Sequence, residues 1–146
     1  MYFPKLKHFR SKENWGSANL MNHDLLKILD NFREYWSKPI VVLCGTQGVH
    51  SSGSLHSYGL AVDVCCPMEL KIMNFYLAAE RFGFTGIGIY PNWKFNRKKC
   101  GGLHLDLRPI GINEAGSRWL GVLDPDDGIN HYFLLDADNI KRFGVL

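Results

Sequence analysis

The clearest hydrophobic pattern in the chain has the period of an α-helix and covers residues 22–37. Asn22 is suited to cap its start, and Pro39 follows its end. The apolar residues that share one face are Leu25, Ile28, Leu29, Phe32, Tyr35 and Trp36. A second helix is predicted to begin at Pro67 and end near Gly83, with a stripe of Leu70, Met73, Leu77 and Phe82. A short helix over 137–143 is predicted near the end of the chain.

Short runs of β-branched and other apolar residues predict the strands. They cover residues 40–44, 61–65, 87–90, 103–107 and 131–135. The strands 87–90 and 103–107 are joined by a loop from 91 to 102 that suits an antiparallel hairpin. Because helices and strands do not alternate strictly, the pattern favours an α+β fold in which helices flank a central, mainly antiparallel sheet. A length of 146 residues without linker or repeat predicts a single domain over 1–146.

Composition excludes several classes of protein. Lys and Arg outnumber Asp and Glu by 17 to 14, and this net charge of +3 is too small to predict nucleic-acid binding. No stretch approaches the ~18 apolar residues of a membrane span, and the N-terminus lacks the apolar segment of a signal peptide. We therefore expect a monomer with no nucleic-acid partner, no membrane span and no export signal.

The four cysteines do not form a recognised metal or redox motif. None has C-x-x-C spacing, and Cys65 and Cys66 are adjacent. We interpret Cys44 and Cys65 as small buried hydrophobic residues within strands, with reduced thiols.

Strict alternation along residues 103–108 separates two kinds of side chain. The leucines point toward the core, and His104, Asp106 and Arg108 share the opposite face. These three side chains form either a surface charge ladder or the wall of a cleft.

A loop rich in glycine and serine presents His56 shortly before the strand that carries Asp63. Small residues at 59 and 61 allow the imidazole and the carboxylate to converge. With a histidine from a second strand, they form a ligand set of the types used by catalytic zinc, whose fourth position stays open. The structural alternative for each residue alone is a solvated histidine and an aspartate that caps a turn.

Two motifs carry a resemblance to a known family. They are Ser54-x-His56-x-x-Gly59-x-Ala61-x-Asp63 and, later, His104-x-Asp106. Together they resemble the superfamily of zinc-dependent D-alanyl-D-alanine carboxypeptidases and related cell-wall endopeptidases, which has the hedgehog/DD-peptidase fold and includes phage endolysins. The resemblance implies that His56, Asp63 and His104 bind Zn²⁺ and that the substrates are peptidoglycan peptides.

The chain departs from this family at the position of the general base. Many members have an acidic residue three positions before the last zinc ligand, where this sequence has Gly101. Asp106 is the candidate catalytic substitute, because residues i and i+2 of a strand share a face. The alternative is that Asp106 orients a metal ligand or pairs with Arg108. His50 is a further candidate proton donor or substrate contact.

A second departure follows the first predicted strand. Relatives often read Ser-Gly-Tyr-Arg there, whereas this chain reads Cys-Gly-Thr-Gln at 44–47. Gln47 cannot neutralise a terminal carboxylate, so endopeptidase action is expected in preference to carboxypeptidase action. By the resemblance, Gln47 and Ser54 are expected to contact the substrate. Arg108, on the polar face of its strand, is expected to compensate for the missing cation and to bind a developing oxyanion.

The expected function is therefore a zinc peptidase that cleaves stem or cross-link peptides of the bacterial wall, as endolysins do. Without an export signal, such an enzyme would act after release from a host cytoplasm or from a virion. One alternative is a non-catalytic wall-binding or virion structural protein that keeps zinc for stability. Signalling domains of the same fold are a third interpretation, which the missing signal peptide disfavours.

Overall fold

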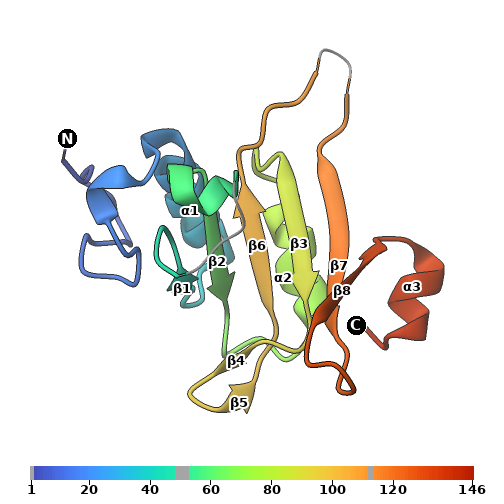
Figure 1. Ribbon diagram of the computed structural model, residues 1–146. Coiled ribbons are helices and arrows are strands. Elements are labelled where there is room, and N and C mark those ends of the chain that lie inside the picture. The colour runs from blue at the N-terminus through green and yellow to red at the C-terminus, as the bar shows by residue number, and fades with distance from the viewer. Residues whose placement is uncertain (1, 49–52, 112–113) are drawn as a thin grey trace.

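The computed structural model describes residues 2–48, 53–111 and 114–146, and within these ranges a six-stranded sheet forms the centre of the molecule. Its strand order is β1-β2-β6-β3-β7-β8. The strands are β1 (Val41–Cys44), β2 (Ala61–Cys65), β3 (Gly86–Tyr90), β6 (Gly102–Asp106), β7 (Ser117–Leu123) and β8 (Asn130–Leu134). β3 and β7 pair in parallel and the other neighbours pair antiparallel. The α+β fold with a mainly antiparallel sheet is confirmed (Figure 1).

Helices cover one face of this sheet. α1 (His23–Trp36) and α2 (Ile72–Ala79) lie behind the strands in Figure 1, and α3 (Ala137–Arg142) lies beyond β8. The Asn22 side chain accepts a hydrogen bond from the backbone N–H of Leu25 and caps α1, as its sequence predicted. Short elements complete the chain: η1 (Ala18–Leu20), η2 (Leu55–Tyr58), and a hairpin of β4 (Lys94–Phe95) and β5 (Lys98–Lys99).

The hydrophobic core lies between the helices and the covered face of the sheet. Leu103 and Leu105 of β6 are fully buried there, as the alternation along this strand predicted. They pack in one cluster with Phe32 of α1 and Phe75 of α2. The segment before α1 joins the same cluster through the buried side chains of residues 9, 15 and 21. The core thus leaves the polar side chains of β6 on the opposite, open face.

The second helix begins later than predicted and buries a different face. Residues 67–71 form a turn followed by irregular chain, in which Glu69 pairs with Lys38 and accepts a hydrogen bond from the backbone of Lys71. Leu70 and Leu77, expected in the core, are 95% and 57% exposed. The residues with the i, i+3, i+4, i+7 spacing of a buried stripe are instead Ile72, Phe75, Tyr76 and Ala79.

β7 is a strand that the sequence pattern did not predict. Its apolar run is interrupted by Arg118 and Gly121, so it lacks the alternation of a half-buried strand. It pairs with β3 in parallel and with β8 antiparallel, and it places Trp119 on the open face of the sheet.

In the described ranges, no helix is long and apolar enough to cross a membrane.

Glycine at position 86 is required by the close approach of a neighbouring side chain. Gly86 in β3 lies opposite Asp106 in β6, and a Cβ at this position would lie 2.1 Å from Asp106 Oδ1. Any side chain here would force the Asp106 carboxylate to move. The fold therefore leaves space on β3 for a buried carboxylate on β6.

We expect Gly86→Ala to lower the free energy of unfolding by ~1–3 kcal/mol, the usual cost of overpacking. Urea denaturation measures this change. Gly83→Ala is the matched control, since its Cβ would find Ile28 Cδ1 as nearest neighbour at 3.9 Å. Equal stability of the two variants would contradict the close packing described for position 86.

Candidate metal centre

Three polar side chains from separate elements meet on the open face of the sheet. Asp63 and His104 are directly opposite each other in the β2–β6 pairing, so their side chains share a face. His56 comes from η2, which is followed by Gly59 with a positive φ of 69°. A Cβ at Gly59 would lie 1.9 Å from the carbonyl oxygen of Leu20, which explains glycine at this position of the motif.

The atoms that face one another have the spacing of a metal site. His56 Nε2 is 3.2 Å from His104 Nδ1 and 3.3 Å from Asp63 Oδ1. His104 Nδ1 is 3.1 Å from Asp63 Oδ1. In a tetrahedral zinc site with bonds of roughly 2.0–2.1 Å, neighbouring ligand atoms lie about 3.3 Å apart. The residues predicted as ligands therefore fit around a single zinc ion.

Hydrogen bonds at the outer nitrogens orient both imidazole rings. His56 Nδ1 donates to the carbonyl oxygen of Gly45 at 2.8 Å, and His104 Nε2 donates to Asp106 Oδ2 at 2.8 Å. Both partners only accept hydrogen bonds, so each outer nitrogen carries a proton. In a neutral ring the lone pair then lies on the inner nitrogen, which faces Asp63. Such an arrangement can hold a metal cation.

The same contacts shift the pKa values of the three groups. Burial lowers the pKa of His56, but hydrogen bonds with Asp63 and Cys44 outweigh it and raise the pKa to about 10. The pKa of His104 is also raised, because its bonds to Asp106 and Asp63 outweigh burial. Burial opposes ionisation of Asp63, yet the two histidines hold its pKa below the ordinary value. The group is thus built to attract a cation, whether a proton or a metal.

Asp106 lies at the other nitrogen of the His104 ring and is fully buried. Its carboxylate also accepts hydrogen bonds from the backbone N–H, Nε and Nη2 of Arg108, at 3.0, 3.0 and 2.6 Å. Burial acts to raise the pKa of Asp106, but His104 and Arg108 hold it well below the usual range. Asp106 therefore remains ionised and is held in place by both neighbours.

A pocket of about 330 Å³ opens beside His104. Its lining residues are Gly53, Ser54, Leu55, Tyr90, His104, Arg108 and Trp119. The Arg108 guanidinium lies 4.8 Å from the centre of the Trp119 ring, and Trp119 Nε1 donates to the Tyr90 hydroxyl at 3.0 Å. The structure thus brings two of the predicted substrate contacts, Ser54 and Arg108, to one pocket beside the predicted metal ligands.

Gln47, the remaining predicted substrate contact, is engaged elsewhere. Its Oε1 accepts a hydrogen bond from the backbone of Gly45 at 2.8 Å, and its Nε2 donates to the carbonyl oxygen of Asn14 at 2.7 Å. The side chain thereby ties the loop after β1 to the N-terminal segment. It is not among the described residues that line the pocket. His50 lies outside the described residues.

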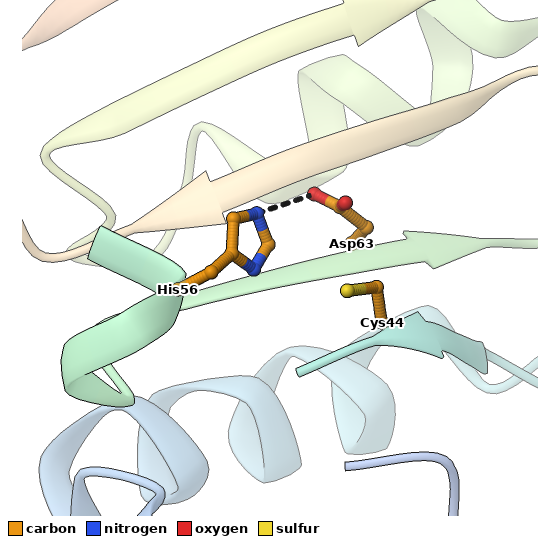
Figure 2. A group of neighbouring side chains, drawn as sticks. All are labelled: Cys44, His56 and Asp63. Carbon is orange, nitrogen blue, oxygen red and sulfur yellow. Dashed lines mark ion pairs between the residues drawn. The ribbon is translucent and has the colours of Figure 1, made fainter. Parts of the chain in front are cut away.

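Cys44 is a potential ligand that sequence reasoning missed. It is half-buried rather than fully buried, and its sulfur lies with ligand atoms of His56 and Asp63 in a group that spans no more than 4.8 Å. Figure 2 shows the thiol beside the ion pair of the other two side chains. An irregularity in the β1–β2 pairing brings Cys44 opposite Asp63, and this register is not readable from the sequence. The thiol also donates to the carbonyl oxygen of Gln47 at 3.3 Å.

A second group with ligand atoms close enough for a cation lies on the turn after β7 and on the start of β8. It consists of Asp124, Asp127 and His131. His131 pairs with Asp127 at 2.7 Å, and both side chains are largely exposed. Exposed acidic groups of this kind are common without a metal, so the group provides a control for the buried centre.

Comparison with protein-family models, curated proteins and solved structures gives no match to this chain. Its class is therefore defined by fold and geometry. It is an α+β domain with a His/Asp/His group that can hold a metal, located beside a pocket on the open face of a sheet.

We expect zinc binding at pH 7 to release at least about one proton per ion, because a metal must displace the proton of His56. With the pKa of His56 at about 10, this ring is protonated at pH 7 in protein stripped of metal. Zinc affinity should therefore fall as the pH is lowered. Calorimetric titration in buffers with different ionisation enthalpies measures the proton count.

His131→Ala is the control for this titration, because it removes the exposed group and leaves the buried one intact. The proton count of this variant should equal that of the wild type. A zinc-binding enthalpy that does not depend on the buffer would contradict the protonated state inferred for His56.

Proposed function

We propose that this protein is a zinc metallopeptidase that hydrolyses peptide bonds in stem or cross-link peptides of bacterial peptidoglycan. The observation that carries the proposal is the triangle of His56 Nε2, Asp63 Oδ1 and His104 Nδ1, with sides of 3.1–3.3 Å. The substrate class is supported by the resemblance of both motifs to cell-wall peptidases. Endopeptidase action is favoured, because Gln47 is engaged with backbone groups and provides no cation for a terminal carboxylate.

Each ligand has a defined role in this proposal. His56 and His104 would hold zinc through their inner nitrogens, and Asp63 would contribute a negative oxygen between them. When bound, zinc supplies the Lewis acidity that polarises a carbonyl group and activates water. A His/Asp/His set is of the three-ligand type found in catalytic zinc sites. The adjoining pocket gives a peptide access to the side of His104.

Arg108 is the residue that we assign to the substrate carbonyl oxygen. Its Nε and Nη2 bind Asp106, so Nη1 is the end of the guanidinium left for another group. Stacking on Trp119 restricts the side chain, and the pocket lies next to it. A fixed cation at this position stabilises negative charge that develops on an oxygen during hydrolysis.

We propose that Asp106 is a positioning residue for this reaction. It accepts a hydrogen bond from His104, fixes the proton on the outer nitrogen and so directs the lone pair toward Asp63. It also holds Arg108 in place. A carboxylate with full burial and four bonded donors is poorly suited to take a proton from water.

A second candidate function is a zinc protein without catalytic activity, and the position of Cys44 favours it. A thiolate from Cys44 would complete a closed set of four protein ligands, as in structural zinc sites. Zinc bound in this way would displace the thiol proton and its hydrogen bond to the carbonyl oxygen of Gln47, just as it would displace the proton of His56.

We expect zinc-loaded protein to release fragments with internal cuts from purified peptidoglycan, as measured by mass spectrometry of the products. Addition of a chelator should stop the release and zinc should restore it. His104→Ala should remove both zinc and activity, since it deletes a ligand. His131→Ala should keep both, because its group lies on the surface.

Two outcomes of this digestion would contradict the proposal in different ways. Release of terminal D-alanine alone would overturn endopeptidase action and leave a carboxypeptidase. Intact substrate would support the structural candidate if the cobalt-substituted protein also shows a thiolate absorption band that Cys44→Ser removes.

We expect Asp106→Asn to weaken zinc binding by roughly 10–100-fold, the usual effect of losing a carboxylate that orients a ligating histidine. Competition with a chromophoric chelator measures the dissociation constant. If Asp106 instead accepts the proton of the attacking water, zinc affinity stays unchanged while turnover falls and the acidic limb of the pH profile disappears. The affinity measurement separates the two roles.

A further inference from the structure

The open face of the sheet continues from the metal centre to the edge strand β8. Strand register places one row of residues across it, in the order Asp63, His104, Gly88, Trp119 and Leu134. In the neighbouring row, Tyr132 of β8 lies opposite Gly121 of β7. Residues directly opposite in adjacent strands project from the same face. The rows therefore connect the candidate metal centre with the side chains of β8.

Glycines in these rows allow aromatic rings to lie on the sheet. A Cβ at Gly88 would lie 2.4 Å from Trp119 Cε2, and one at Gly121 would lie 2.3 Å from Tyr90 Cε1. Each ring thus lies against the backbone of the next strand. Trp93 stacks on Tyr90 with ring centres 4.2 Å apart.

These rings and two side chains of β8 lie along the same side of the sheet, and we call the group the aromatic strip; within it Tyr90 is buried, with 8% exposure. Its members are Tyr90, Trp93, Trp119, Tyr132 and Leu134. Tyr132 and Leu134 are 66% and 74% exposed, so the outer end of the strip is open to solvent. Tyr90 and Trp119 also line the pocket beside His104, and the Tyr90 and Tyr132 rings lie 6.5 Å apart. The strip is therefore an extension of that pocket.

The chemistry of the strip matches a sugar ring. A pyranose has an apolar face of C–H groups and a rim of hydroxyls, so it packs on an aromatic ring and bonds to polar groups beside it. The side chains of the strip are themselves uncharged, with the Arg108 guanidinium over Trp119 at one end, and the exposed ring of Tyr132 offers a phenol hydroxyl. At its edge, Asn92 Oδ1 accepts a hydrogen bond from the backbone of Leu123, which leaves the amide NH₂ of Asn92 as a donor.

The distance between the metal centre and the exposed ring of Tyr132 suits a peptide that is attached to a sugar. His104 and Tyr132 are separated by three strand-to-strand steps, from β6 through β3 and β7 to β8, which corresponds to ~14 Å. An extended peptide spans ~3.3–3.6 Å per residue, so about four residues cover this distance.

We propose that the aromatic strip binds the sugar of a glycan-linked peptide and places a bond about four residues away at the metal centre. This inference rests on the proposed function and narrows its substrate class to peptides that remain attached to a glycan. The exposed ring of Tyr132 is the main contact for the sugar, and Trp119 guides the peptide toward His104.

The first test measures sugar binding without catalysis. Chelator-treated protein is titrated with a tetrasaccharide of β-1,4-linked N-acetylglucosamine, and chemical shifts of the tryptophan indole N–H groups are followed. We expect saturable binding that weakens by at least about tenfold in Tyr132→Ala. Tyr35→Ala is the matched control, because Tyr35 is a 50% exposed tyrosine on α1, and it should bind as the wild type does.

The second test compares two substrates of the zinc-loaded enzyme, one peptide with its sugar and the same peptide without it. We expect kcat/KM to favour the sugar-linked peptide by at least about tenfold, and Tyr132→Ala to remove this preference. If the protein is not a peptidase, it will cleave neither substrate but will still bind the tetrasaccharide. The two tests therefore distinguish failure of the proposed function from failure of this inference.

Three results would overturn the inference. They are absence of tetrasaccharide binding, equal binding by Tyr132→Ala, and a dimer that Tyr132→Ala dissociates in sedimentation experiments. The last result would assign the strip to contacts between two copies of this chain. Because Tyr132 is exposed, its replacement should leave the melting temperature unchanged, which confirms that each variant is folded.

Discussion

The candidate metal centre depends on two hydrogen bonds that point away from it. The bond from His56 to Gly45 and the bond from His104 to Asp106 decide which nitrogen of each ring is protonated. Without them, either ring could present an N–H to its neighbour and the group would be only a polar network. With them, the inner nitrogens of His56 and His104 and one oxygen of Asp63 are directed at a common point. The carboxylate of Asp63 therefore raises the pKa of both histidines when no metal is present.

Two glycines of β3 make room for the side chains that support this arrangement. Asp106 keeps full burial and its bonds to Arg108 because the opposing residue on β3 is glycine. The second glycine of this strand, Gly88, has no side chain that would overlap the Trp119 ring. The orientation of His104, the position of Arg108 and the shape of the pocket therefore all depend on glycines in β3. On this strand, the candidate site depends on two positions that carry no side chain.

Residue types and alternation, together with the family resemblance, were enough to name the side chains that the structure brings together in the candidate metal centre. His104 and Asp106 lie on one face of β6 because any strand alternates, and Asp63 adjoins them once β2 pairs with β6. The nearness of Cys44 could not be predicted, since it arises from an irregular register between β1 and β2. Trp119 was missed because its strand has no clear period and pairs with a partner far away in the chain. The buried face of α2 differs from the predicted one because the helix begins at Ile72, several residues after the predicted start at Pro67.

The parallel pairing of β3 with β7 has a consequence for the order of assembly. His56, Asp63, His104 and Asp106 all belong to elements that precede β7, whereas Trp119 arrives with a strand that must close a long segment of chain before it can dock. The candidate metal ligands therefore all lie in chain that is complete before the pocket wall formed by Trp119 is added. If the proposed function is correct, metal binding depends on the earlier part of the chain and the shape of the pocket depends on the later part.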